Sequence, residues 1–551
     1  MPDHPQSRRA TAWTGTNAVE EGDATFASAA LGDPSGHTVS ERDIADGGCG
    51  PGRIPLEPGR LHRRISGRDD RARPVSADEL AALGDPMAAG FFRAGRFPTT
   101  VQDLLSALPA TATASRKVYL ISEAGQIPPD AIGERDMRYA ITVAVRDSQI
   151  DLLISTQAGG DPESAFLQVA AWDPAVRVFN FYTRFDSSWV WAGNSWDALE
   201  PDSRGKGCFD SHINGSVVMK ELRIPWINWQ SERATIRLAE DDPLRHDPLY
   251  QEVIGAQRLE LTVRSLVTRW TAARLAAVTA TGVVDHPDRL LRHLFTTTTV
   301  NLAGTDRQSS TITADSQDLT LPTGFWLNQD LLFDDLGLST QAAPPRAPAA
   351  RYVAGLTRFG FRLEERHSSF SQPGDTFFAF VVPEAAHEDN EVVRQLVRTG
   401  LVPARFAACV LMVDFPNPVF SPDRSLLMRY VPTTPTKMTE LCGKVAGTIS
   451  DAARTLPEDS PESRFAAHWK VPEDTWPTAF GQRADTYLRK VTERLRTEDG
   501  YDDYVRLAES RRRQFRRMRL NEFELTLPVT SIPPGAPPLA MRENATVAEL
   551  T

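Results

Sequence analysis

The sequence predicts an α+β protein with a β-rich N-terminal half, a helical middle and a second α+β half. Short segments rich in β-branched and aromatic residues dominate positions 110–240 and are separated by turn residues. Positions 250–280 change to a helical period, and strand-like and helix-like segments mix again over 350–528. With 41% hydrophobic and 24% charged residues among 551, the chain has the composition of a globular protein with a substantial core.

Both ends of the chain are predicted to lie outside this core. Positions 1–75 contain too few large apolar residues to offset the entropy of ordering the chain, so they are predicted to be disordered. The Pro-rich positions 529–551 are predicted to be a flexible tail, and the Pro/Ala-rich stretch 341–351 a linker or long loop. Two folded parts remain: a β-rich domain with a helical extension and a candidate pocket at 76–340, and an α+β domain at 352–528.

The β-rich part begins with a short helix. Ser76 precedes the segment ADELAA and Glu79 lies three residues later, which is the pattern of a capping box. The segments 166–172 and 176–184, joined by Asp-Pro-Ala, are predicted to form a hairpin because both are β-branched and aromatic. The other predicted strands are 116–122, 138–147, 149–157 and 187–196.

Helical periodicity marks the middle of the chain and its end. A helix is predicted over 250–280 because its apolar residues share one face: Leu259, Val263, Leu266, Val267 and Trp270. A second helix is predicted over 286–295, where Pro287 occupies the first turn. Beyond the predicted linker, strands are expected at 351–366, 375–384, 406–415 and 425–432, and helices at 437–455, 480–496 and 501–519.

Charge and hydropathy exclude several classes of protein. The 61 basic and 72 acidic residues give a net charge of −11, which argues against a nucleic-acid binder. There is no apolar run long enough to cross a membrane, and the N-terminus lacks the apolar core of a secretory signal. Four widely spaced cysteines without a CxxC pair are typical of free thiols. We therefore expect a cytoplasmic protein, and the excess of Arg over Lys is typical of a bacterium with a GC-rich genome.

The segment most typical of a binding site is 189–231. The P-loop, the dinucleotide fingerprint, HExxH and GxSxG are all absent from the sequence. Six of the eleven Trp fall between 172 and 229, among glycines, amides, acids, one His and two Lys. Pockets combine large rigid walls with a few polar groups, and the alternative is a Trp-rich core. The predicted substrate-binding residues are Trp189, Trp191, Asn194, Asn214, Trp226 and Trp229.

Asp210, His212 and Lys220 are the predicted catalytic residues. In an extended segment Asp210 and His212 point to one face, where the carboxylate can orient the imidazole as a base or share a metal ion with it. In a helix that starts at Ser211, His212, Ser216 and Lys220 form one stripe, which places a Lys base beside a Ser nucleophile. The alternative without a site is that Asp210 or Ser211 caps a helix and Lys220 is solvated.

A metal site is predicted from His212, His286 and His293. His286 and Asp288, two positions apart and followed by a distal His, match a ligand pattern that binds non-haem iron. This pattern favours iron or haem as the cofactor, although the sequence does not identify the group further. The structural alternative is that His286 and Asp288 stand at a helix start, where the helix dipole stabilises an acidic side chain.

Three further charged segments are assigned to the surface. The run His387-Glu388-Asp389 is predicted to be an exposed acidic loop. Seven arginines in Arg53–Arg73 and six in Arg511–Arg519 are candidates for contacts with an acidic or protein partner. The simpler interpretation is a solvated tail for the first segment and an amphipathic helix with a solvated face for the second.

Together these observations predict an enzyme that acts on a small apolar or aromatic molecule, with iron- or haem-dependent oxidation as the favoured chemistry. One alternative is a non-catalytic binding or scaffold protein that uses the Trp-rich surface and the Arg-rich helix. Another is a cofactor-free hydrolase or lyase that uses Ser216 and Lys220. The expected partners are a small-molecule substrate and, through the Arg-rich segments, a protein. Neither nucleic acid nor a membrane is expected to bind.

Overall fold

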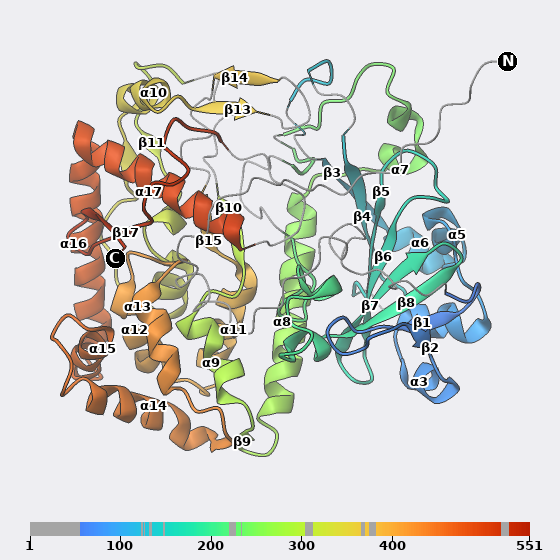
Figure 1. The fold of residues 1–551 in the computed structure, drawn as a ribbon, viewed down its shortest axis with the longest axis horizontal. Coiled ribbons are helices and arrows are strands. Elements are labelled where there is room, and N and C mark those ends of the chain that lie inside the picture. Colours follow the sequence, from blue (N-terminus) through green and yellow to red (C-terminus); the bar gives the residue numbers. More distant parts are fainter. Residues whose placement is uncertain are drawn as a thin grey trace. The chain divides into compact units, whose positions relative to one another are not determined.

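The computed structural model of the chain forms two compact units (Figure 1). Unit 1 comprises Met1–Lys117 and Ala140–Ser216, and unit 2 comprises Val118–Tyr139 and Val217–Thr551. The structure describes residues 56–122, 125, 127–131, 135–146, 149–219, 228–232, 234–303, 312–364, 370–373, 382–518 and 528–550. A large sheet and many helices are both present, so the predicted α+β class is confirmed.

A mostly antiparallel sheet organises unit 1. Its strands follow the order β2 (Arg73–Pro74), β1 (Leu61–Arg63), β8 (Ser188–Asn194), β7 (Val178–Phe185), β6 (Leu167–Asp173) and β5 (Leu152–Gln157). Strands β5 to β8 are antiparallel neighbours, whereas β1 runs parallel to β8. The predicted hairpin is confirmed as β6–β7, and Arg177, with a φ of 58°, lies in its turn. The chain passes between the units within β3 (Lys117–Ser122) and β4 (Met137–Val143).

Short helices precede and follow the strands of unit 1. They are α3 (Ala77–Ala82), α4 (Pro86–Gly90), η1 (Phe92–Ala94), α5 (Val101–Ser106), α6 (Ala110–Ser115), η2 (Asp197–Leu199) and η3 (Gly207–Phe209). The predicted capping box of α3 is confirmed. The Ser76 hydroxyl accepts a hydrogen bond from the Glu79 N–H, and the Glu79 carboxylate accepts one from the Ser76 N–H.

Ordered structure begins earlier than position 76, within the segment predicted to be disordered. Strands β1 and β2 form there, and Leu61 and Ile65 are buried. Because β1 takes its backbone hydrogen bonds from β8, the segment needs few apolar residues of its own. Arg63 and Arg73 both pair with Glu79, so these two arginines of the Arg-rich segment Arg53–Arg73 have partners inside unit 1.

Helices dominate unit 2. Those that position the site are α8 (Gln257–Val278), α9 (Pro287–Phe295), the π-helical turn η7 (Asp330–Asp335) and α11 (His387–Arg398). The others are η4 (Pro243–His246), α7 (Pro248–Gln251), η6 (Thr323–Phe325), α10 (Ala349–Arg358), α12 (Ala404–Leu411), η8 (Met412–Asp414), α13 (Pro422–Leu426), η9 (Leu427–Tyr430), α14 (Met438–Ala452), α15 (Pro461–Trp469), α16 (Trp476–Leu495) and α17 (Glu498–Arg517). In the part of the chain that the structure describes, none of the helices combines the length and apolar character that a membrane crossing needs.

Short antiparallel strand pairs connect the helices of unit 2. They are β9 (Val283–Val284) with β16 (Thr436–Lys437), β10 (Val300–Ala303) with β15 (Val382–Ala385), β11 (Leu319–Thr320) with β12 (Arg346–Ala347), β13 (Arg362–Glu364) with β14 (Ser371–Pro373), and β17 (Leu539–Met541) with β18 (Val547–Glu549). Within the predicted strand 375–384, the structure describes positions 382–384, and these form the start of β15. The predicted linker 341–351 lies inside unit 2, where it contains β12 and the start of α10.

Two segments predicted as strands are largely helical, and the predicted strand 351–366 is helical in its first half and contains β13 in its second half. Positions 406–415 lie mostly in α12 and η8, positions 425–432 in α13 and η9, and positions 351–358 in α10. Phe406 and Cys409 are both completely buried, like the rest of α12 around them. A short helix that is apolar on every side shows no helical period, so its sequence cannot be told from that of a buried strand.

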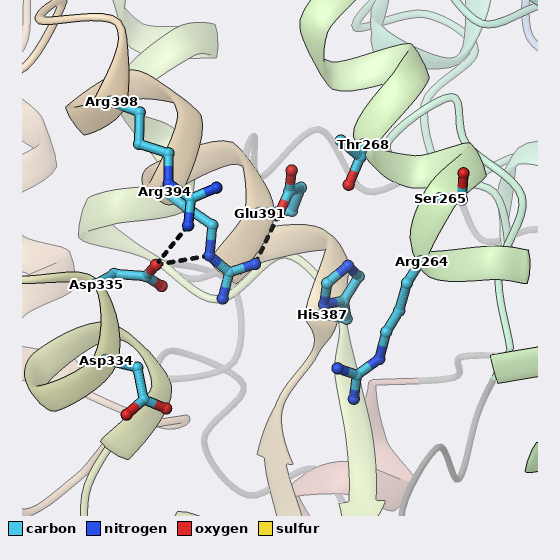
Figure 2. A pocket seen from close by; sticks show the side chains of 9 residues that line it. All are labelled: Arg264, Ser265, Thr268, Asp334, Asp335, His387, Glu391, Arg394 and Arg398. Atoms are coloured by element: carbon cyan, nitrogen blue, oxygen red, sulfur yellow. Dashed lines mark hydrogen bonds and ion pairs between the residues drawn. The ribbon is translucent and has the colours of Figure 1, made fainter. Parts of the chain in front are cut away.

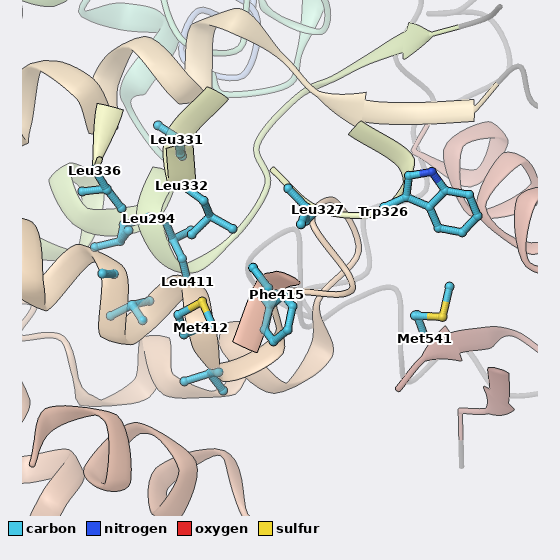
Figure 3. Packing of buried hydrophobic residues seen from close by; sticks show 14 of the residues in the cluster. Leu294, Trp326, Leu327, Leu331, Leu332, Leu336, Leu411, Met412, Phe415 and Met541 are labelled. Atoms are coloured by element: carbon cyan, nitrogen blue, oxygen red, sulfur yellow. The ribbon is translucent and has the colours of Figure 1, made fainter. Parts of the chain in front are cut away.

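The core of unit 2 is one continuous cluster of buried apolar side chains (Figure 3). Leu294 of α9, Leu332 of η7 and Leu411 of α12 all belong to it. These three elements come from distant parts of the sequence. Val392 and Leu396 of α11 belong to the same cluster, so the core holds η7 and α11, two of the elements that line the site described below. Met541, near the C-terminus, belongs to the same cluster.

The C-terminal segment, predicted to be flexible, is docked on this core. Met541 in the β17–β18 hairpin is 1% exposed. The Asn417 side chain donates a hydrogen bond to the Met541 carbonyl at 2.8 Å and accepts one from its N–H at 2.9 Å. The Tyr504 hydroxyl donates to the Ala545 carbonyl at 2.9 Å. Side chains from other elements therefore hold the tail, and its own Pro-rich composition does not reveal them.

Candidate functional site

The tryptophans of β8, predicted to line a pocket, are core residues. Trp189 is completely buried, and its indole N–H donates to the Pro98 carbonyl at 3.0 Å. Trp191 donates its indole N–H to the side-chain oxygen of Asn180 at 3.1 Å. Trp229 is also buried, in unit 2, and Trp226 lies outside the described residues. These placements favour the alternative in which the segment is a Trp-rich core.

His212 lies in a loop of unit 1 whose contacts fix its ring. Its Nδ1 donates to the Ser216 carbonyl at 2.8 Å, and its ring centre lies 4.8 Å from that of Phe181. Asp210 follows η3 and is half-buried. Residues 211–219 form turns and extended chain rather than a helix, so the predicted stripe of His212 and Ser216 is not formed, and Lys220 lies outside the described residues.

The two predicted asparagines belong to the loop structure that follows β8. The Asn194 side-chain oxygen accepts a hydrogen bond from the Trp196 N–H at 2.8 Å, which forms a local turn. Asn214 is buried. Next to it, Gly215 has a φ of 71°, and a Cβ at this position would lie 2.3 Å from the Ser195 carbonyl oxygen. The loop is therefore closely packed where a substrate was expected.

His293 has no nitrogen left for the predicted metal ion. It is buried, its Nδ1 donates to Asp389 at 2.7 Å, and its Nε2 accepts a hydrogen bond from Arg274 at 3.1 Å. His286 is exposed at the N-terminus of α9, and His212 belongs to the other unit. Among the residues with described positions, no group of three or more His, Cys, Asp or Glu is arranged to hold a metal ion. Among the described residues the three histidines therefore form no group of metal ligands, and iron binding stays a prediction.

A charged pocket of about 490 Å³ lies between α8, η7 and α11 of unit 2 (Figure 2). This volume is in the range of small-molecule sites. The lining residues are Arg264, Ser265 and Thr268 of α8, Asp334 and Asp335 of η7, and His387, Glu391, Arg394 and Arg398 of α11. The four α11 residues are spaced by three or four positions, so they share one face of the helix. Three arginines face three carboxylates, and their formal charges cancel.

Ion pairs hold one wall of the pocket. The Arg394 guanidinium lies 2.7 Å from Asp335 and 2.6 Å from Glu391, and Arg398 lies 3.6 Å from Asp335. Burial acts to raise the pKa of Glu391, but hydrogen bonds from Gln395 and Arg394 outweigh it and lower that pKa. Glu391 is therefore ionised at neutral pH, and Arg394 is committed to two carboxylates.

Three buried polar atoms of the pocket have no hydrogen-bond partner among the described residues. They are Nε2 of His387, Oδ2 of Asp335 and Nε of Arg264. Another nitrogen of Arg264 pairs with Glu260 at 2.6 Å, one helical turn earlier. Buried polar atoms in folded proteins nearly always have a partner, so three unpaired atoms in the residues that line one pocket require an explanation.

His387 is a neutral imidazole in this pocket. Burial, and then the nearby positive charge of Arg264, lower the pKa of His387 to about 4. In Figure 2 the His387 ring and the Arg264 side chain lie on one side of the pocket, and Asp334 and Asp335 lie on the other. At neutral pH one ring nitrogen of His387 therefore carries a lone pair that can accept a proton.

The start of α11 is buried, which corrects the exposed loop predicted for His387-Glu388-Asp389. Asp389 accepts hydrogen bonds from Nδ1 of His293 and from the backbone N–H groups of Thr298 at 2.8 Å and Thr299 at 3.2 Å. Burial acts to raise the pKa of Asp389, but these partners outweigh it and lower that pKa. His387 thus stands two residues before an anchored carboxylate, on a helix end fixed to α9 and the segment after it.

The arginines near the end of α17 are mostly used inside unit 2. Arg511 is buried and donates to the Pro416 carbonyl at 3.0 Å. Arg512 is buried and pairs with Glu509 at 2.7 Å. Arg513 donates to three backbone carbonyls of the C-terminal segment. These three arginines are therefore not free for the partner contact predicted for the Arg-rich helix.

The cysteines differ from the four free thiols expected. Cys208 is disulfide-bonded, whereas Cys409 and Cys442 are free and buried. Burial raises the pKa of both free thiols to about 12, so neither is an activated nucleophile. Spacing along the chain does not show which cysteines meet, because that depends on the fold.

Comparisons with protein-family models, with curated protein sequences and with solved structures find no match to this chain. The pocket and its side chains are therefore the basis for inferring a function.

Proposed function

We propose that the protein is an enzyme that acts on a small polar molecule in the pocket between α8, η7 and α11, with His387 as the proton acceptor. The observation that supports this most is the buried Nε2 of His387, which has no partner among the described residues and lines a pocket of charged side chains. Histidine is the commonest general base in enzymes. A substrate O–H or N–H placed against Nε2 can transfer its proton there, and Arg264 stabilises the negative charge that develops.

This proposal keeps the small-molecule enzyme expected from the sequence but changes its site and substrate. A pocket lined by three arginines and three carboxylates favours a polar substrate over an apolar or aromatic one. Trp189 and Trp191 pack in the core of unit 1, and neither they nor Asp210 and His212 belong to the proposed site.

Chemical modification tests whether the buried Nε2 of His387 can be reached from the pocket. Diethyl pyrocarbonate acylates neutral imidazoles that have an unbonded nitrogen. We expect acylation of His387 in the native protein at pH 7 and little at His293 or His468, whose ring nitrogens all have hydrogen-bond partners. Peptide mass spectrometry gives the extent at each residue. Equal protection of His387 and His293 would contradict the proposal.

A matched pair of variants tests the catalytic role. The wild type, the variant His387→Gln and the control His286→Gln are each incubated with a mixture of water-soluble metabolites, and consumption is followed by mass spectrometry. His286 is exposed and lies outside the pocket. We expect the wild type and the control to consume at least one metabolite. His387→Gln is expected to consume it at least about 100 times more slowly, which is the usual effect of losing a general base. Equal consumption by His387→Gln, or none by the wild type, would overturn the proposal.

Two other functions expected from the sequence remain separate proposals. If the protein is an iron- or haem-dependent oxidoreductase, freshly purified protein is expected to show a Soret band or to contain near-stoichiometric iron. A colourless, iron-free protein would contradict this function. For a binding or scaffold protein, a stable partner in pull-down experiments is expected, with no turnover of any metabolite. Alanine variants of His212, His286 and His293 would show whether these residues hold any iron that is found.

The cytoplasmic location is likewise a proposal. A disulfide bond such as that of Cys208 is more typical of an oxidising compartment. Fractionation of the source cells, followed with an antibody against the protein, decides between the cytoplasm and an oxidising compartment. A cytoplasmic protein stays with the soluble marker enzymes of the cytosol.

A further inference from the structure

We propose that the pocket binds a molecule with two opposite charges, such as an amino acid, with its ammonium group against the carboxylates of η7 and its anionic group against Arg264. This inference rests on the proposed function, because it assigns a ligand class to the same pocket. It adds which charges the ligand carries and which residues recognise each of them.

The balance of charge around the pocket favours such a ligand. Three arginines and three carboxylates line it, and His387 is neutral at neutral pH. A simple anion that enters is repelled by Asp334 and Asp335, and a simple cation is repelled by Arg264 and Arg398. A molecule with one charge of each sign can place both beside opposite charges, so the pocket discriminates against ligands with a single charge.

The charges are only partly separated in space, because Arg394 and Arg398 pair with Asp335 on the side of η7. Asp334 and Asp335 lie on one side of the pocket, and Arg264 of α8 lies on the other (Figure 2). Arg394 is already held between Asp335 and Glu391 at 2.7 and 2.6 Å. Arg398 pairs with Asp335 at 3.6 Å, whereas Arg264 pairs at 2.6 Å with Glu260, which does not line the pocket. Arg264 is therefore the arginine best placed to meet the anionic group of a ligand.

The unpaired atoms match the same ligand in their hydrogen-bonding character. Oδ2 of Asp335 is an acceptor, which suits an ammonium hydrogen. Nε of Arg264 is a donor, which suits a carboxylate or phosphate oxygen. Nε2 of His387 is a second acceptor when the ring proton is on Nδ1, and it then suits another N–H or an O–H of the ligand. Ligand atoms with these properties would satisfy all three buried groups at once.

Isothermal titration calorimetry with defined probes tests the ligand class. The probes are glycine, β-alanine, 4-aminobutanoate and 6-aminohexanoate, which carry both charges at increasing separation, and butanoate and butylamine, which carry one charge each. We expect at least one of the four doubly charged probes to bind at least ten times more tightly than either singly charged probe. If none of the four binds, or if butanoate or butylamine binds as tightly as the best of them, the proposal is wrong.

Variants of the two charged walls identify the groups that recognise the ligand. With the best probe, Arg264→Gln and Asp334→Asn are each expected to weaken binding at least tenfold. The matched control Arg454→Gln removes an exposed arginine just after α14 that does not line the pocket, and it is expected to leave the affinity unchanged. Equal affinity for Arg264→Gln and the control would overturn the assignment of Arg264.

The two proposals about this pocket can fail independently. If metabolite consumption requires His387 but no doubly charged probe binds, the ligand class is wrong and the catalytic role of His387 stands. If a probe binds in a manner that depends on Arg264 and no metabolite is consumed, the ligand class stands and the protein binds its ligand without converting it.

Discussion

Tyr182 donates its hydroxyl hydrogen to Oδ2 of Asp85 at 2.6 Å in the buried interior of unit 1. The other oxygen of Asp85 caps α4 by accepting the Met87 N–H at 2.8 Å, and the Asn180 amide donates to Oδ2 at 2.9 Å. One buried carboxylate therefore ties the start of α4 to the central strand β7. Burial raises the pKa of Asp85 to about 6, against the effect of these hydrogen bonds.

Removing the Tyr182 hydroxyl is expected to destabilise unit 1. The variant Tyr182→Phe leaves the buried Asp85 carboxylate with one donor fewer, which costs about 1.5–3 kcal/mol of unfolding free energy for a hydrogen bond to a charged group. Tyr430→Phe is the matched control, because its hydroxyl also donates to a carboxylate, that of Glu462 at 3.0 Å, but is only half-buried. Urea unfolding followed by fluorescence measures both. Equal losses in the two variants would show that burial does not strengthen the contact.

The variant Asp389→Asn is expected to destabilise unit 2. Asp389 is buried and accepts hydrogen bonds from His293, Thr298 and Thr299, so its replacement leaves donors unpaired at the start of α11. A hydrogen bond to a charged group contributes about 1.5–3 kcal/mol, so a loss of about this size or more is expected. Asp451→Asn, at an exposed position of α14, is the control, and its effect is expected to stay within about 0.5 kcal/mol. Thermal unfolding of both proteins provides the comparison.

Stability is expected to fall in mild acid. Burial lowers the pKa of His468 to about 3 and that of His387 to about 4, whereas both titrate near 6.5 in the unfolded chain. Between pH 6.5 and 4 the unfolded chain binds protons that the folded chain does not, so the free energy of unfolding decreases as the pH decreases. The urea midpoint measured at pH 7 and pH 4.5 shows this. His468→Gln is expected to reduce the change, and His286→Gln, at an exposed position, to leave it intact.

Cys409 and Cys442 are expected to resist alkylation in the native protein. Both are buried, and their pKa values of about 12 leave very little thiolate at pH 8. Iodoacetamide labelling read by peptide mass spectrometry is expected to modify them at less than about a tenth of the rate seen in urea. Rapid native labelling of either cysteine would mean that α12 or α14 opens readily.

Much of the fold follows from local rules. The capping box at Ser76 and Glu79 and the hairpin 166–184 were predictable because each involves residues close together in the sequence. The helix at 257–278 was predictable from its one apolar face. The helical structure of positions 406–415 was not predictable, because a short helix buried on every side has no polar face to reveal its period. Likewise, β1 forms because it pairs with β8, which lies more than 100 positions later in the sequence.

The candidate site could not be predicted in the same way. The pocket draws its residues from 264–268, 334–335 and 387–398, which only the packing of α8, η7 and α11 brings together. The run His387-Glu388-Asp389 has the composition of a surface loop because charged residues are seldom buried unless they are paired. The partners of Asp389 are His293 and Thr298, more than 90 positions earlier.

Composition and short-range pattern were thus enough for the α+β class, strands β5 to β8 of unit 1 and the longer helices, since these depend on neighbours along the chain. The pocket, the neutral state of His387 and the docking of the C-terminal tail depended on tertiary packing, because a polar or charged group can be buried only where distant residues supply its partners.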